Sequence, residues 1–184
     1  MKATGIVRRI DELGRVVIPK EIRKTMRIRE SDPLEIFTDK DGEIILKKYS
    51  PIGDLMEFSR GYTDAINKSI NRIVLICDKD TIVSVSGGSK KEYLDKKISK
   101  DLEKIIELRR LAKFDINDRN NMVDIYDGEE AEGKYTEQII APIVAEGDTT
   151  GAVMIISKES NKMGDVEFRI AEIASSLIAQ QMES

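Results

Sequence analysis

The sequence contains no histidine and no tryptophan, and only one cysteine, Cys77, among its 184 residues. Without histidine, the chain cannot build a Ser-His-Asp triad, a Cys-His pair, a His-ligated metal site or an imidazole acid-base catalyst. A single thiol forms no disulfide within the chain, so we expect Cys77 to be a small buried apolar residue. An enzyme built from this sequence would have to rely on carboxylate or lysine chemistry.

Long apolar runs are also missing. No run approaches the roughly 20 residues that a helix needs to cross a bilayer, and Met1 is followed by polar and basic residues. We therefore expect a cytoplasmic protein with no membrane partner. The composition, with 40% apolar and 35% charged residues, is typical of a globular protein that buries a core.

Charge is divided unequally along the chain. Residues 1–50 hold 12 Lys and Arg against 9 Asp and Glu, a net charge of +3. Because the whole chain carries −4, residues 51–184 carry −7. The first 29 residues alone hold 9 basic against 3 acidic side chains, a net of +6. A basic end on an acidic chain indicates binding to a polyanion such as nucleic acid.

The basic end begins with β-branched runs at residues 4–10 and 15–18, which predict two strands joined by a turn at 11–14. Pro19 suits the first position of a helix, which we expect to continue to about Met26.

The spacing within this helix predicts two faces. Ile22, Thr25 and Met26 fall on one side, which we expect to pack, and Lys20, Arg23, Lys24 and Arg27 fall on the other. Four cations on one side repel one another, and phosphates lying alongside would relieve this repulsion.

A second hairpin is predicted at 34–38 and 43–49, because Asp41-Gly42 supplies the positive φ of a tight turn. Four short strands and one short helix make a poor core for a lone chain of this size. We therefore expect an obligate dimer with interleaved strands. Such a dimer presents two copies of the basic residues on one two-fold symmetric surface, which suits duplex DNA.

The run from Thr4 to Arg23, TGIVRRIDELGRVVIPKEIR, closely resembles the swapped-hairpin DNA-binding domain of the AbrB transition-state regulators, and residues 44–49 fit it too. The resemblance implies a homodimer that presses arginines against DNA, with the contacting positions at Arg8, Arg15, Arg23 and Lys24. Lys24 is commonly arginine in that family, so a planar bidentate fork is replaced by a point charge. We add three residues to the predicted DNA contacts from their spacing in the sequence alone: Arg9, Lys20 and Arg27.

Ser50-Pro51 marks a boundary, which predicts one domain at 1–50 and a second at 51–184. In the second domain, apolar spacing predicts a connector helix at about 52–70 that includes Leu55, and a closing helix at about 165–182. Between them we expect strands at 73–77 and 81–85, a helix at 100–113, a weaker strand at 122–126, a solvated acidic loop at 127–134 and an apolar strand pair at 139–145 and 151–157.

This order of elements resembles a GAF domain, a small-molecule sensor module of bacterial regulators, and Met163-Gly164-Asp165 resembles its closing pattern. The predicted fold class is therefore α+β: an AbrB-like swapped hairpin for dimerisation and DNA binding, followed by a GAF-like α/β sensor domain. Apolar residues form a stripe on the last helix, which either covers its own sheet or pairs subunits in a bundle: Val166, Ile170, Ile173, Ala174, Leu177, Ile178 and Met182.

Two further segments contain residue types that are common in ligand-binding sites. Gly87-Gly88-Ser89-Lys90 lacks the spacing of a phosphate-binding P-loop and predicts a turn. The acidic residues at 127–132 lack the ordered spacing of a calcium loop. We therefore expect no cofactor and no metal, and only an unidentified small-molecule ligand or partner for the GAF-like domain.

The whole chain resembles sporulation regulators that combine these two parts. The resemblance implies activation and repression of late sporulation genes in the forespore, binding to double-stranded promoter DNA, and assembly as a dimer of dimers. An antitoxin-like module is the alternative, because related swapped-hairpin modules also cap toxins. The third hypothesis is an enzyme that uses carboxylates or lysine, which no spacing supports.

Overall fold

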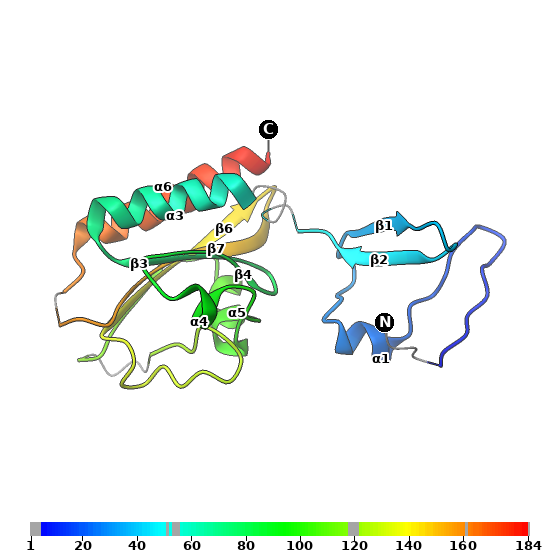
Figure 1. Ribbon diagram of the computed structural model, residues 1–184, viewed down its shortest axis with the longest axis horizontal. Helices are drawn as coiled ribbons and strands as arrows, with labels where there is room; N and C mark the ends of the chain where they lie inside the picture. The colour runs from blue at the N-terminus through cyan, green and yellow to red at the C-terminus, as the bar shows by residue number, and fades with distance from the viewer. Residues whose placement is uncertain (1–4, 51, 53–55, 118–121, 161, 184) are drawn as a thin grey trace. The chain divides into compact units, whose positions relative to one another are not determined.

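The computed structural model describes residues 5–50, 52, 56–117, 122–160 and 162–183. The chain divides into two compact units, unit 1 at Met1–Tyr49 and unit 2 at Ser50–Ser184 (Figure 1). Thr4 of the first predicted strand, and Pro51 and Leu55 of the predicted connector, lie outside the described residues. Among the helices that are described, none is both long and apolar enough to span a bilayer.

Unit 1 contains one short helix and one hairpin. Helix α1 (Lys20–Thr25) starts directly after Pro19, so the proline precedes the helix rather than opening it. Strands β1 (Leu34–Thr38) and β2 (Ile44–Lys48) pair antiparallel, and Gly42 has a φ of +80° in the turn between them. This confirms the predicted second hairpin.

The strands predicted at 4–10 and 15–18 are not formed within the single chain. Their turn is present, because the Asp11 N–H donates to the Arg15 carbonyl at 3.0 Å and Gly14 has a φ of +76°. The side chains on both arms stay in water, with Val7 85% and Val17 71% exposed. A strand is stable when a neighbouring strand pairs with it and its apolar face is covered, and no described strand of the same chain pairs with these arms.

Unit 2 is built on one antiparallel sheet of five strands in the order β4-β3-β7-β6-β5. The strands are β3 (Ile73–Asp78), β4 (Ile82–Ser86), β5 (Ala112–Asp115), β6 (Glu137–Ala145) and β7 (Asp148–Ser157). Four of them confirm predicted strands. Cys77 in β3 is fully buried as expected, and burial raises the pKa of its thiol.

Side chains along β7 alternate between the two faces of the sheet, because a strand has a period of two. Val153 and Ile155 face one core, and Met154 and Ile156 face the other. Both faces are therefore covered, and the central strands are almost wholly apolar.

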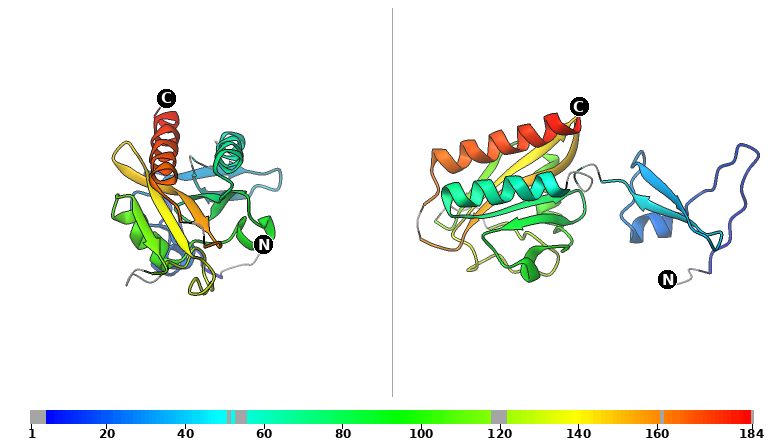
Figure 2. Two further views of the ribbon diagram at one scale, coloured as in Figure 1. Left: turned by 90° about the vertical axis from the view of Figure 1, so that its left-hand side faces the viewer. Right: turned by 45° about the horizontal axis from the view of Figure 1, so that its top comes forward.

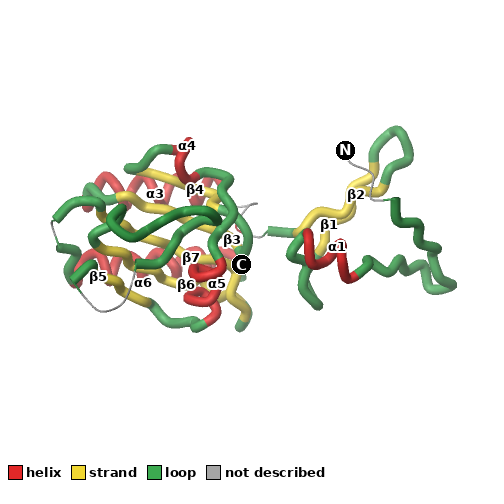
Figure 3. Tube along the Cα trace, turned by 90° about the horizontal axis from the view of Figure 1, so that it is seen from below, coloured by secondary structure: helices red, strands yellow, loops and turns green. Residues whose placement is uncertain are grey.

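Helices α3 (Met56–Ile70) and α6 (Asp165–Met182) lie side by side on one face of the sheet (Figures 1 and 2). On α6 the buried residues are small apart from Ile178, with Ala171 and Ala174 among them, so the helix approaches the strands closely. The other face carries α4 (Lys90–Tyr93), α5 (Lys100–Glu107) and long connecting loops (Figure 3). The turn predicted at Gly87–Lys90 is confirmed, with a φ of +74° at Gly87.

The helix predicted at 100–113 ends early, at Glu107. Leu102 and Ile106 are buried as its spacing predicted, but Arg109 has a φ of +55°, which no α-helix continues through. Residues 112–115 then form edge strand β5, pairing with β6. The prediction was wrong there because pairing with a distant strand outweighs local helix propensity.

The strand predicted at 122–126 is also absent. The Gln138 side chain takes the place of a neighbouring strand: its Oε1 accepts from the Val123 N–H at 2.8 Å and its Nε2 donates to the Val123 carbonyl at 2.7 Å. The Ser99 N–H donates to the Ile125 carbonyl at 3.1 Å. These bonds satisfy the buried backbone without a ladder.

The acidic loop at 127–134 is solvated only in part. Asp127, Glu130 and Glu132 are exposed, as expected. Glu129 is buried, accepts from the Ile125 N–H at 2.5 Å and pairs with Lys134. A carboxylate buried in this way needs such partners, because burial of an unpaired charge is costly.

The start of unit 2 is anchored to the sheet. Ser50 Oγ donates to Asp78 Oδ2 at 2.7 Å, and Ile52 is fully buried. Gly151 allows this packing, because a Cβ there would lie 2.0 Å from the Cys77 carbonyl oxygen and 2.7 Å from Ile52 Cδ1.

We expect Gly151→Ala to lower the free energy of unfolding of unit 2 by about 3 kcal/mol, because the new methyl group overpacks the β3–β7 contact. Gly61→Ala is the matched control, since nothing lies within 4 Å of its added Cβ on helix α3. That change should stabilise the helix by roughly 0.5–1 kcal/mol. Urea unfolding at one fixed protein concentration measures both, and equal effects would refute the close approach at Gly151.

Candidate nucleic-acid interface

The seven basic residues predicted to contact DNA all lie in unit 1, at three places. Arg8 and Arg9 are on the arm before the first turn, and Arg15 directly follows it; Lys20, Arg23 and Lys24 are on α1, and Arg27 lies beyond its end. Arg8, Arg9, Arg15, Lys20 and Lys24 are exposed, and Arg23 and Arg27 are half-buried.

The first turn fixes the backbone of Arg15. One oxygen of the Asp11 carboxylate accepts from the Leu13 N–H at 3.0 Å and from the Arg15 N–H at 2.8 Å, and the other accepts from Arg15 Nε at 2.8 Å. The backbone N–H of Arg15, and then its side chain, lower the pKa of Asp11. The carboxylate therefore stays ionised and holds the turn in acid until the pH falls below this lowered pKa.

The second turn repeats this geometry with a different charge. Asp39 Oδ1 accepts from the Asp41 and Glu43 N–H groups at 3.0 Å, as Asp11 does from Leu13 and Arg15. The residue after the turn is Glu43 in the second hairpin and Arg15 in the first. The position directly after the turn is therefore cationic in the first hairpin and anionic in the second.

Helix α1 keeps the predicted cationic group of Lys20, Arg23 and Lys24, at positions i, i+3 and i+4. Its other side differs from expectation. Thr25 and Met26 are exposed and only Ile22 is half-buried, so the predicted packing face is not covered within one chain.

The helical spacing that placed Arg27 on the cationic face was wrong. The helix ends at Thr25, and Arg27 has a φ of +51°. There it closes the helix, with its N–H donating to the Lys24 carbonyl and the next N–H, of Ile28, donating to the Arg23 carbonyl at 2.7 Å. Lys48 Nζ donates to the Arg27 carbonyl at 3.0 Å, where a cation is favoured by the helix dipole.

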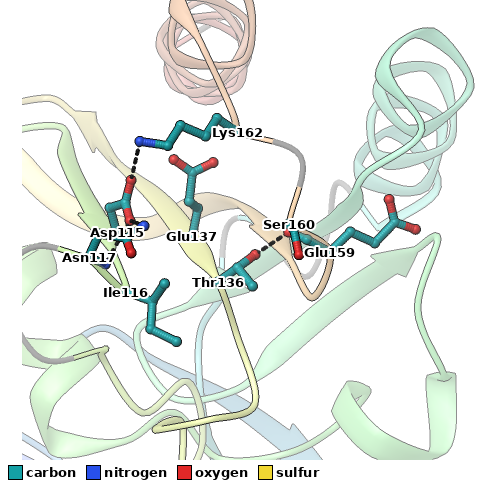
Figure 4. A pocket seen from close by; sticks show the side chains of 8 residues that line it. All are labelled: Asp115, Ile116, Asn117, Thr136, Glu137, Glu159, Ser160 and Lys162. Atoms are coloured by element: carbon teal, nitrogen blue, oxygen red, sulfur yellow. Dashed lines mark hydrogen bonds and ion pairs between the residues drawn. The ribbon is translucent and has the colours of Figure 1, made fainter.

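A small hollow in the described part of unit 2 is a second place to consider as a binding site. It is lined by eight residues, Asp115, Ile116, Asn117, Thr136, Glu137, Glu159, Ser160 and Lys162 (Figure 4). Its volume of about 210 Å³ is below the roughly 300 Å³ at which ligand pockets usually begin. Its charges are paired within the chain, since Lys162 lies 3.8 Å from Asp115 and Lys113 lies 3.2 Å from Glu137.

Metal binding has no support in the part of the chain that the structure describes, where no three Cys, Asp or Glu side chains gather in a group able to hold an ion. Sequence reasoning missed one other group, in which Glu129 and Lys134 meet three tyrosines. The available signal was that three of the five tyrosines of an aromatic-poor chain fall at positions 93, 126 and 135. No spacing showed that they meet.

Solved structures show the fold of unit 2. The GAF domain of Thermosynechococcus elongatus PixJ is similar with a TM-score of 0.58 and 13% identity, covering 74% of this chain and 89% of that one. The GAF domain of an Acinetobacter phosphoenolpyruvate-protein phosphotransferase gives a TM-score of 0.58 at 7% identity, covering 74% and 84%. Unit 2 therefore has the GAF fold, and the predicted α+β class is confirmed.

Unit 1 is similar to the transition state regulatory protein AbrB of Bacillus subtilis, with 67% identity over 51 residues, 28% of this chain and 52% of that protein. A family model described as the antidote-toxin recognition protein MazE, a bacterial antitoxin, matches residues 7–54. An AbrB-like module that carries exposed arginines, followed by a GAF-fold domain, defines a transcription factor.

The remaining matches identify which transcription factor family this is. A family model described as stage V sporulation protein T C-terminal, transcription factor, matches residues 54–183. Stage V sporulation protein T of Bacillus subtilis is 53% identical over 184 residues, covering 100% of this chain and 99% of that protein. The chain belongs to the stage V sporulation protein T family, and the enzyme hypothesis is set aside.

We expect Arg15→Gln to raise the pKa of Asp11 only partway back to its ordinary range. The arginine side chain is lost, but the backbone N–H of residue 15, which is the larger cause of the lowered pKa, remains. Carbon-13 NMR titration of the Asp11 carboxyl measures this, with Lys24→Gln as a control for charge alone. An equal rise in both variants would show that the turn does not couple these two residues.

Proposed function

We propose that this chain is a sequence-selective regulator that binds double-stranded DNA at promoters of late sporulation genes, as activator and repressor, in the cytoplasm of the forespore. Residues 1–50 would form the swapped-hairpin dimer that contacts DNA. Residues 51–184 would sense a ligand or partner and join dimers. The observation that carries the proposal is that unit 1 exposes its cations and its apolar side chains together.

The apolar surface of unit 1 supports an obligate dimer. The large apolar residues that stay exposed in one chain are Ile6, Val7, Ile10, Leu13, Val16, Val17, Met26, Ile36, Phe37, Ile44, Leu46 and Tyr49. A monomer rarely leaves so much apolar surface in water. A second copy that pairs with the arms at 5–10 and 15–18 would bury these residues and complete the strands that are not formed in one chain.

Such a dimer would bring two sets of basic residues to one surface. The net charge of +6 in the first 29 residues becomes about +12, which favours phosphate binding. Arg8, Arg9 and Arg15 would then flank the turns, and Lys20, Arg23, Lys24 and Arg27 would stand beside them. Arginine at Arg8, Arg15 and Arg23 suits base reading, and lysine at Lys24 suits phosphate contact.

Helix α6 supports assembly beyond the dimer, because its two sides differ. Ala174 and Ile178 cover the sheet, whereas Val166 is 64%, Ile173 56% and Leu177 41% exposed. With half-buried Ile170 between them, these residues repeat at intervals of 4, 3 and 4, the seam spacing of a helix pair. The exposed seam would join two dimers into a tetramer.

The antitoxin hypothesis has one observation in its favour, the MazE family model at residues 7–54. Such antitoxins usually bind a toxin through a short flexible tail that folds on its partner. Here the described residues after Ser50 form a folded domain with its own core. Regulation of transcription is therefore the better-supported function.

We expect DNA binding to fall steeply with salt, by about 10³-fold between 50 and 200 mM if six or more phosphates are contacted. Arg8→Ala, Arg15→Ala and Arg23→Ala should each weaken binding to promoter fragments by about 1–3 kcal/mol. Fluorescence anisotropy with specific and random duplexes measures both affinity and selectivity.

Lys104→Ala is the matched control, because it removes one exposed cation from unit 2 and so reports the effect of net charge. Binding that ignores salt, or equal losses for Lys104→Ala and the three arginine variants, would contradict the proposed interface.

We expect Ile173→Glu to convert tetramers into dimers, because it puts a charge in the exposed seam of α6. Val17→Glu should instead disrupt the unit 1 dimer and abolish DNA binding. Sedimentation velocity distinguishes the two species. If Ile173→Glu leaves the assembly unchanged, the seam is not the interface.

A further inference from the structure

The ammonium group of Lys134 lies among three tyrosine rings on the loop-covered face of unit 2. Its Nζ is 4.9 Å from the ring centroid of Tyr126, 5.1 Å from that of Tyr135 and 5.3 Å from that of Tyr93. A cation within about 6 Å of an aromatic ring is attracted to it, more strongly where water is excluded. Tyr93 and Tyr135 are almost fully buried, so two of the three contacts are shielded.

Hydrogen bonding around Lys134 matches a primary ammonium group. Such a group has three N–H donors, and Nζ meets three acceptors: the carboxylate of Glu129, the carboxylate of Glu92 at 2.8 Å and the Tyr126 hydroxyl at 3.1 Å. A quaternary ammonium ion has no N–H donors and could not replace these three hydrogen bonds. Although burial opposes the charge, the bonds to Glu129 and Glu92 raise the pKa of Lys134.

These five residues, Glu92, Tyr93, Tyr126, Glu129 and Tyr135, form what we call the ammonium cage. Contacts other than those to Lys134 hold its walls. The second oxygen of Glu129 accepts from the Ile125 N–H, the Tyr135 hydroxyl donates to Glu129, and the Tyr93 and Tyr135 hydroxyl oxygens lie 3.2 Å apart. Tyr93 and Tyr126 pack edge to face at 6.1 Å. The cage is therefore organised for a cation by the rest of the domain.

Lys134 reaches the cage from a surface turn. Gly133, just before Lys134, has a φ of +74° and is exposed. Gly128, in an earlier turn of the same loop, has a φ of +82°. The Lys134 side chain keeps 23% of its surface in water, so the cage is open to solvent along it. A second cation, Lys158, lies 3.1 Å from Glu92 at this opening.

We propose that the ammonium cage is a binding site for primary organic amines in their ammonium form, which Lys134 occupies when no free amine is bound. A free amine that displaces Lys134 would release the turn at 132–134, which carries this lysine, from the cage. This proposal gives the class of ligand for the sensing role proposed above. Any effect of the amine on DNA binding depends on that role.

The probe is n-propylammonium, because Lys134→Ala removes three carbons and the nitrogen that this ion restores. Isothermal titration of the full chain should show saturable binding to the unchanged protein and, to Lys134→Ala, binding at least about tenfold tighter, since no lysine must be displaced first. Tetramethylammonium should bind Lys134→Ala about tenfold more weakly than the probe.

Three variants control the measurement. Lys104→Ala, which removes an exposed lysine elsewhere, should bind the probe as the unchanged chain does. Glu129→Gln combined with Lys134→Ala should lose the tighter binding. Lys134→Met keeps the apolar part of the side chain, and because it still fills the cage it should block the probe without unfolding the domain.

The proposal is overturned if Lys134→Ala binds n-propylammonium no better than Lys104→Ala, or if it binds tetramethylammonium equally well. Binding to Lys134→Ala with none to the unchanged chain also overturns it, because Lys134 would then be a fixed structural residue. All titrations are done without DNA, so a failure here leaves the proposed DNA contacts of Arg8, Arg15 and Arg23 untouched.

Discussion

Apolar side chains on the arms of unit 1 remain in water in the single chain, and the need to bury them is the constraint on which the rest of the structure depends. Val7 and Val17 lie on opposite sides of a well-formed turn, yet no described strand of the same chain pairs with either arm. A module of about 50 residues without disulfides or metals buries too little surface to be stable alone. This shortage is the physical reason for the proposed dimer, which would place two copies of the arginines on one two-fold symmetric surface.

The two faces of the sheet in unit 2 are covered in different ways. On one face, Ala171 and Ala174 let α6 approach the strands closely, and the opposite side of that helix keeps an apolar seam. On the other face, polar side chains hold irregular backbone in place, as Gln138 does for Val123 and Glu129 does for Ile125. The first face carries the apolar seam on which the proposed assembly depends, and the second holds the ammonium cage.

One glycine allows the first residues of unit 2 to pack against its sheet. Gly151 lets the fully buried Ile52 lie against strands β3 and β7, and Ser50 bonds to Asp78, the last residue of β3. The chain that leaves unit 1 is thus fixed to the central strands at its first residues in unit 2.

Local patterns predicted the elements that depend on neighbours in the sequence. The Asp-x-x-Gly turns at 11–14 and 39–42, the apolar strands β6 and β7 and the apolar stripe of α6 all follow from residues a few positions apart. The absence of histidine excluded several classes of enzyme, and the basic first 29 residues indicated binding to a polyanion. The seven basic positions assigned to DNA contact remain predictions.

Tertiary structure alone decided the rest, because contacts between distant residues have no sequence period. Residues 112–115 are a strand only because β6 lies beside them, and 122–126 is not a strand because Gln138 bonds to its backbone. Arg27 leaves the helical face because the helix closes at Thr25. Glu129 looked solvated in the sequence, and it is buried because Lys134 and Tyr135, held by the fold, supply the partners that its charge requires.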